Sequence, residues 1–205
     1  RPVLNENRYV SYFDKNIRFP AVIFTYPTAP RFHADEAPLD CLAEILGTGK
    51  SSYFYKNFVK TQKAIQASSF NPASELAGEF SMFVLPFPGG SLSDFETEVV
   101  QILADFEVAG VTDADIEKFK ADRESNMINS LASVSGKVSQ LASFQTLKGT
   151  PNGIGAELDR YMAITKDDVM RVFRKYIKDQ PYVLTSVLAS EDAEPAKPDN
   201  FEIPT

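Results

Sequence analysis

The stretch Leu46-Gly47-Thr48-Gly49-Lys50-Ser51-Ser52-Tyr53-Phe54-Tyr55-Lys56-Asn57-Phe58-Val59-Lys60 decides how this chain folds. Its two glycines predict the end of one helix, because glycine reaches left-handed backbone angles at little cost. The two serines that follow are suited to cap a second helix, whose apolar side carries aromatic residues. A β-prone run begins at Ala64. Residues 46–69 therefore predict a helix, a turn, a second helix and a strand.

The residues before this stretch predict a lead-in, a strand and a helix. Residues 1–16 are polar and mixed, which indicates an irregular lead-in. Residues 17–28 alternate apolar and β-branched side chains, which is typical of a strand, and Pro20 places its first part at an edge or a bulge. Asp35 is then expected to cap a helix that carries apolar residues at helical spacing.

The residues after this stretch predict a hairpin and then mostly helices. Residues 64–70 and 78–87 are two strands joined by a turn that begins at Asn71-Pro72. Further helices are expected at 92–108, 112–131, 134–147, 156–162 and 166–177, with a final strand at 182–188. Capping-box spacings predict three helix starts, at Ser93 with Glu96, Thr112 with Asp115, and Thr165 with Asp168. The two Asp versions fit less well, because the Asp side chain is shorter.

Strands and helices in this order favour an α+β fold, with a mostly antiparallel sheet and helices packed on one face. We expect a single domain over residues 17–190. It follows the lead-in at 1–16 and precedes an acidic, proline-rich tail at 191–205, which is interpreted as a linker or a loosely docked segment.

The composition limits the classes of function. The formal net charge is −7, and an acidic chain is unsuited to nucleic acid or to anionic membrane surfaces. No stretch is long and apolar enough to cross a bilayer. The single cysteine, Cys41, excludes an intrachain disulfide and is interpreted as a buried, inert thiol. The start at Arg1, without a methionine or a signal-like apolar run, suggests a piece of a longer protein.

Further motifs extend the pattern set by the opening stretch. The hairpin leads into Pro88-Gly89-Gly90-Ser91-Leu92, a later helix starts at Gly110-Val111-Thr112, and the last helix region carries Tyr161, Ile164-Thr165, Asp167-Asp168 and Lys175-Tyr176. In this order and spacing, residues 17–188 resemble the non-catalytic C-terminal-type domain of the M16 (pitrilysin/insulinase-type) zinc metallopeptidases. The resemblance implies the fold of one M16 peptidase/LuxS-like metallohydrolase half.

The resemblance also implies a function. M16 enzymes build a clamshell from homologous α+β domains, of which one half carries the zinc motif His-x-x-Glu-His and the other closes a chamber over an unfolded or short peptide. This chain has one histidine, His33, one cysteine and no such motif, whereas a catalytic zinc site takes about three protein ligands. We therefore expect no cofactor in this chain and no activity of the chain alone. Zinc is expected in a homologous partner domain, on the same polypeptide or on a separate subunit.

The resemblance also gives candidates for a substrate cleft. Some M16 enzymes contribute an Arg and a Tyr from the empty half, and the matching positions here are Val59 and Gln66. Val59 cannot form a charged bond to a peptide carbonyl, and Gln66 can donate a hydrogen bond but not through a phenol. The candidates are therefore Val59, Lys63 and Gln66, without a direct catalytic role. We expect Val59 and Gln66 near a concave face of the sheet that binds a second domain or an extended peptide, and a sheet edge in the chamber is suited to pair with such a peptide.

Other residues have simpler interpretations. His33 lies in a loop beside an acid and is interpreted as a surface residue. Glu36, Asp40 and Glu44 share one helical face and are interpreted as a solvated face. The run Gly47-x-Gly49-Lys50-Ser51 is not a phosphate loop, because its glycines follow a helix.

A rival hypothesis is a structural or peptide-binding protein that kept the fold and lost proteolysis, as some M16-like subunits of membrane complexes have. A domain with His-x-x-Glu-His, upstream or in a neighbouring gene, would favour the peptidase. The family suggests a periplasmic location, with the cytoplasm as the alternative.

Overall fold

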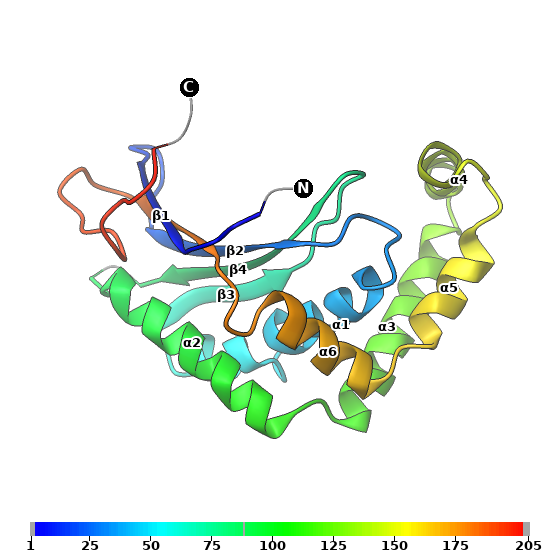
Figure 1. Ribbon diagram of the computed structural model, residues 1–205, viewed down its shortest axis with the longest axis horizontal. Helices are drawn as coiled ribbons and strands as arrows, with labels where there is room; N and C mark the ends of the chain where they lie inside the picture. Colours follow the sequence, from blue (N-terminus) through cyan, green and yellow to red (C-terminus); the bar gives the residue numbers. More distant parts are fainter. Residues whose placement is uncertain (1–2, 88, 203–205) are drawn as a thin grey trace.

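The computed structural model describes residues 3–87 and 89–202, and its centre is one five-stranded sheet (Figure 1). The strand order is β1-β5-β2-β4-β3. The strands are β1 (Arg8–Phe13), β2 (Ala21–Thr28), β3 (Ala64–Phe70), β4 (Gly78–Pro86) and β5 (Val183–Leu188). β1 pairs with β5 in parallel and the other three pairings are antiparallel. The predicted α+β fold with a mostly antiparallel sheet is confirmed.

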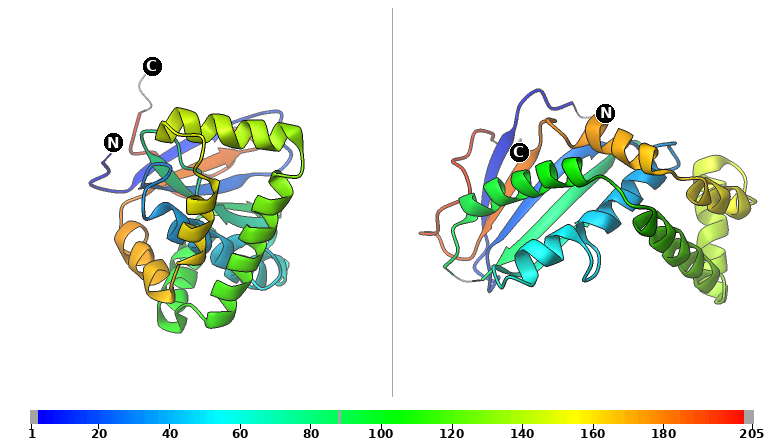
Figure 2. Two further views of the ribbon diagram at one scale, coloured as in Figure 1. Left: turned by 90° about the vertical axis from the view of Figure 1, so that its right-hand side faces the viewer. Right: turned by 90° about the horizontal axis from the view of Figure 1, so that it is seen from below.

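The helices form a layer and an arm. The layer covers one face of the sheet (Figure 2) and consists of α1 (Glu36–Gly47), the π-helical turn η1 (Tyr55–Val59), α2 (Leu92–Ala109) and α6 (Lys166–Tyr176). The arm extends past one end of the sheet and consists of α3 (Asp113–Ser130), α4 (Val134–Lys148) and α5 (Ile154–Met162). Within the described residues, none of these helices has both the length and the apolar character needed to cross a membrane.

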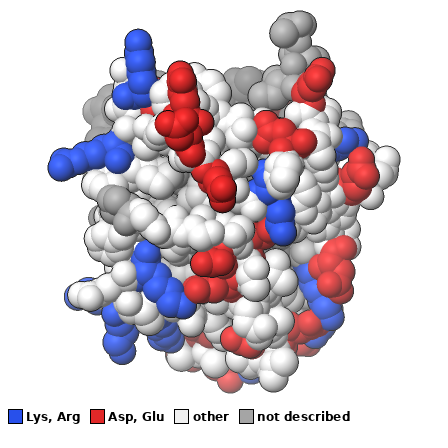
Figure 3. All heavy atoms as spheres, turned by 90° about the vertical axis from the view of Figure 1, so that its left-hand side faces the viewer, with Lys and Arg blue, Asp and Glu red and all other residues white. Residues whose placement is uncertain are grey.

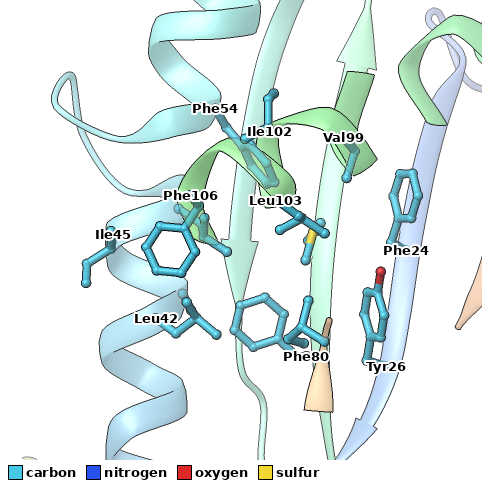
Figure 4. Packing of buried hydrophobic residues seen from close by; sticks show 14 of the residues in the cluster. Phe24, Tyr26, Leu42, Ile45, Phe54, Phe80, Val99, Ile102, Leu103 and Phe106 are labelled. Carbon is cyan, nitrogen blue, oxygen red and sulfur yellow. The ribbon is translucent and has the colours of Figure 1, made fainter. Parts of the chain in front are cut away.

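The hydrophobic core lies between the sheet and the helix layer. Alternate strand residues enter it, among them Phe24 and Tyr26 of β2 and Phe80 of β4. They face Leu42 of α1 and Phe106 of α2 (Figure 4). Aromatic rings supply much of the contact, as when Phe106 meets the ring of a phenylalanine in α6 edge to face, with ring centroids 5.0 Å apart.

The glycine turn forms as the opening stretch predicts. Gly47 is the last residue of α1, and it lies so close to β3 that a Cβ there would stand 2.0 Å from the backbone nitrogen of Ser69. Gly49 has a φ of +78°, which favours glycine. The hydroxyl of Ser52 accepts a hydrogen bond from the amide of Tyr55 at 3.3 Å. The predicted helix–turn–helix–strand is confirmed, with a second helix that is short and partly π-helical.

At the ends of the chain, the prediction for the lead-in is wrong, and of the two interpretations of the tail the docked segment agrees with the structure. Arg8–Phe13 in the predicted irregular lead-in is the edge strand β1. The tail is not a free linker, because the backbone nitrogen and oxygen of Tyr9 both hydrogen bond to Asn200, at 2.8 and 3.1 Å. The buried amide of Ala196 also donates to the hydroxyl of Ser186 at 2.9 Å. The sheet is thus larger than predicted, and the tail covers its β1 edge.

The helix caps differ in detail from the predictions. Both Asp capping boxes form, at Thr112 and Thr165, so the shorter carboxylate is no obstacle. The box predicted at Ser93 is wrong, because the N-cap of α2 is Ser91, two residues earlier. Its acid, Glu96, instead accepts a hydrogen bond from the hydroxyl of Tyr182 at 2.8 Å. Asp35 occupies the N-cap position of α1 but makes no capping bond.

Asp35 instead binds α6. Its carboxylate accepts from Arg171 at 2.6 Å, from Lys175 at 2.7 Å and from the hydroxyl of Tyr176 at 2.8 Å. Burial alone would raise the pKa of Asp35, but these three donors hold it well below its usual range. Asp35 therefore joins the start of α1 to α6.

Candidate functional site

The candidate site is the face of the sheet that the helix layer leaves uncovered, here called the open face (Figure 1). The strand registers place alternate residues on it from each strand. Apolar side chains dominate these positions: Tyr12 of β1, Ile23 of β2, Phe70 of β3, Phe83 and Leu85 of β4, and Val187 of β5. Phe70 and Tyr12 are 45% and 61% exposed. Within the described residues, the open face is an apolar surface without a helix over it.

A hollow of about 530 Å³ lies at the end of the open face where the β3–β4 loop begins. The loop, the end of β2 and the N-terminal segment form its walls. Its lining residues are Leu4, Thr25, Pro27, Pro72, Ser74, Leu76, Ala77, Gly78, Glu79 and Val183. Leu76, on the loop, is 80% exposed. An apolar hollow with few polar groups is typical of a site for an apolar ligand or side chain.

The three predicted cleft residues do not lie together on this face. Gln66 is exposed on β3 opposite Leu85, at a bulge, and so belongs to the open face. Lys63 precedes the strand, and its ammonium pairs with the carboxylate of Glu98 in α2 at 2.8 Å. Val59 is partly buried and packs against the core cluster. The structure therefore places one of the three candidates on the open face, and their roles stay a prediction.

The two edges of the sheet differ. The tail covers β1 at one edge through Asn200, and β3 is the last strand at the other.

The side of the molecule nearest β1 and the tail carries acidic and basic side chains interspersed (Figure 3). This arrangement differs from the lysine- and arginine-rich faces that bind nucleic acid.

The residues that the structure describes do not fit a zinc site. Within 3–87 and 89–202, no three His, Cys, Asp or Glu side chains gather in a way that would hold a metal ion. The ring nitrogen Nδ1 of His33 accepts a hydrogen bond from the amide of Asp35 at 3.0 Å. Cys41 is fully buried, and burial raises the pKa of its thiol, so it stays protonated. The interpretation of Cys41 as a buried, inert thiol agrees with its burial.

The acidic face of α1 is not solvated, contrary to the prediction. Each acid forms an ion pair with a residue of the arm: Glu36 with Arg160 at 2.7 Å, Asp40 with Arg123 at 3.4 Å, and Glu44 with Lys118 at 2.8 Å. The hydroxyl of Tyr161 also donates to Asp40 at 2.7 Å. Burial raises the pKa of both Glu36 and Asp40, against the lowering effect of their partners. This row of ion pairs attaches the arm to α1.

The sequence pattern does not identify the residues around the hollow. The alternation in β3 and β4 predicts two faces, but it does not tell which face the helices cover. Leu76 carries the clearest overlooked signal, because it is a large apolar residue in a loop that is otherwise small and polar.

Comparisons with known proteins agree with this fold. The family described as "Peptidase M16 inactive domain" matches residues 1–122, more than half of the chain. The zinc protease PqqE of Helicobacter pylori is 27% identical over 148 residues, which are 72% of this chain and 33% of PqqE. A crystal structure of a protease from Helicobacter pylori has a TM-score of 0.80 and 23% identity, over 91% of this chain and 45% of that chain. The periplasmic protease PqqL from Escherichia coli has a TM-score of 0.72 and 12% identity, over 91% and 21%.

These matches differ in what they establish. At 23% and 12% identity, the two solved structures establish the fold alone. This chain spans about a third of PqqE and less than half of the Helicobacter protease chain.

Proposed function

This chain belongs to the peptidase M16 family, as an inactive domain, and from that premise we propose that it is the non-catalytic half of a zinc metallopeptidase. In this proposal its open face forms one wall of a chamber and binds an unfolded or short peptide. A homologous zinc-bearing domain, on the same polypeptide or on a separate subunit, lies opposite and supplies the chemistry.

One observation carries this proposal: an apolar sheet face with a hollow, in a chain whose described residues lack a metal-binding group. An extended peptide presents side chains alternately to both sides, so an apolar wall accepts many sequences without selecting one. Gln66 on the open face offers an amide for a peptide carbonyl. Excluding water from the chamber would strengthen every polar contact made there.

The test compares peptide hydrolysis by the chain alone with hydrolysis by the chain together with a zinc-bearing domain. The purified chain with added zinc should not hydrolyse an unfolded fluorogenic peptide, and co-expression with a zinc-bearing M16 domain should give chelator-sensitive turnover. Chelator-sensitive turnover by the chain alone would refute the non-catalytic role. Peptide binding by the chain without any zinc-bearing partner in the source genome would favour the rival, a peptide-binding subunit.

Two substitutions test the carried-over cleft positions. Gln66→Arg and Val59→Asp should weaken turnover by the assembled enzyme while circular dichroism of the domain stays unchanged. Turnover equal to wild type in both would refute these positions as cleft residues. Because Val59 packs on the core, unfolding of the Val59 variant would assign that position to packing, and Gln66 would then carry the test alone.

We also propose a periplasmic location. The proposal is supported by the fold shared with the periplasmic protease PqqL. Fractionation of cells that express the full-length protein at its natural level tests it, and recovery in the cytoplasmic fraction would refute it.

A further inference from the structure

Helix α4 in the arm has an apolar stripe that the rest of the described chain does not cover. Val134, Val138 and Leu141 are 79%, 59% and 44% exposed. Their spacing of four and three residues places them on one side of the helix. Figures 1 and 2 show α4 standing apart from the helix layer, past the end of the sheet.

The stripe is distinct from the side by which α4 attaches to the chain. That side carries Phe144, the one fully buried side chain of α4, which stacks on Phe32 with ring centroids 5.2 Å apart. At about 100° per residue, Phe144 lies roughly a quarter turn around the helix from the middle of the stripe, with Leu141 at the border between the two sides. The stripe is therefore not needed to hold α4 in place.

The charges of α4 also mark it as a contact surface. Its fifteen residues include two lysines, Lys137 and Lys148, and no acid, although the chain as a whole has a net charge of −7. Lys148 already pairs with Glu157 at 3.3 Å. Depletion of charge around exposed apolar residues is typical of the core of a protein–protein interface.

We infer that this stripe docks the zinc-bearing domain and anchors it beside the open face. The inference rests on the proposed function and names the surface by which the two halves meet. Figure 1 shows the arm passing the end of the sheet, so that α4 lies level with the β3–β4 loop at the border of the open face. A domain placed over the open face would therefore reach α4 as well.

Two further observations select this occupant. The matched protease chain is more than twice as long as the part that this chain covers, which leaves room in that protein for a second domain of similar size. Lys137 at the border of the stripe favours an acidic rim on that domain, to which the lysine would bring an opposite charge.

The test is binding between the chain and a co-expressed zinc-bearing domain of the same enzyme. Val138→Asp and Leu141→Asp should each raise the Kd tenfold or more, because a charge would be buried in an apolar contact. The matched control is Ser139→Asp, which places the same charge elsewhere around the exposed helix and should change the Kd less than twofold. Circular dichroism should show all three variants folded, since these side chains are exposed.

The outcomes separate this inference from the proposed function. If wild type binds and the stripe variants bind equally well, the docking surface is wrong and the proposed function survives. If wild type does not bind, the proposed function fails and the docking surface with it. If the chain alone forms a dimer that Val138→Asp abolishes, the occupant is a second copy, and the inference is wrong in its partner.

Discussion

Replacing Gly47 with alanine should destabilise the whole domain, because the end of α1 touches the backbone of β3. The added Cβ would stand 2.0 Å from the nitrogen of Ser69, 2.4 Å from its hydroxyl oxygen and 2.7 Å from the carbonyl carbon of Ser68. Two of these three atoms are backbone, so a rotamer change cannot relieve the clash. Helix α1 has to move away from the sheet instead.

The size of the effect follows from that movement. Ordinary contact begins at 3.4 Å, so α1 has to withdraw by more than 1 Å, and overpacking of this kind costs about 1–3 kcal/mol. The withdrawal also stretches the buried hydrogen bond from the Ser69 hydroxyl to the carbonyl of Ala43, which is 2.8 Å long and contributes about 1 kcal/mol. We therefore expect Gly47→Ala to lower the free energy of unfolding by about 2–4 kcal/mol.

Urea denaturation followed by circular dichroism measures this change. Gly155→Ala is the matched control, because nothing lies within 4 Å of a Cβ at this helical position, and it should be neutral or slightly stabilising. Gly49→Ala should cost about 1–2 kcal/mol through its left-handed backbone alone. If Gly47→Ala unfolds within 0.5 kcal/mol of the Gly155 control, the close approach of α1 to β3 does not govern stability, and the argument fails.

Three further substitutions test individual contacts. Asp35→Asn should lower the free energy of unfolding at pH 7 by about 2 kcal/mol. Because the folded-state pKa of Asp35 is depressed, wild type has this extra stability above about pH 4 and loses it as the pH falls further. Urea denaturation at pH values from 7 to 3 measures this loss. Arg160→Met leaves the buried Glu36 and Glu157 without their guanidinium and should cost about 3–5 kcal/mol at pH 7. Because burial raises the pKa of Glu36, its carboxyl takes up a proton early as the pH falls and then needs no partner, so the loss should shrink toward acidic pH. Thr112→Ala should lower stability by about 1 kcal/mol, whereas Ser93→Ala, outside any cap, should stay within 0.5 kcal/mol of wild type in the same denaturation assay.

The sequence predicts those parts of the fold that are specified by residues close together along the chain. The turn at Gly47 and Gly49 depends on backbone angles that few residues other than glycine adopt, and the Thr112 box depends on a contact three residues away. Strand β1 depends on β5, which follows about 175 residues later. Its own residues do not reveal that partner, so the sequence alone predicts an irregular segment there.

The same limit explains the acids of α1 and the candidate site. Glu36, Asp40 and Glu44 have the spacing of a solvated face, and nothing nearby in the sequence names their partners. Those partners follow 74 to 124 residues later, on α3 and α5. The sequence does not identify the open face for a comparable reason. Alternation along a strand predicts two faces, and only the packed helices decide which of them stays uncovered.

The row of ion pairs has a consequence for how the two halves would meet. The close contact of Gly47 fixes α1 on β3, which carries Gln66 of the open face, and Glu36 attaches the arm to the same helix. The position of α4 relative to the open face is therefore set through α1. Arg160→Met, which leaves the apolar stripe of α4 intact, should weaken binding of the zinc-bearing domain, and the weakening should become smaller as the pH falls, because the raised pKa of Glu36 lets its carboxyl become neutral. The co-expression binding assay with Ser139→Asp as control measures this, and equal Kd values for Arg160→Met and wild type would show that the arm keeps its position without these pairs.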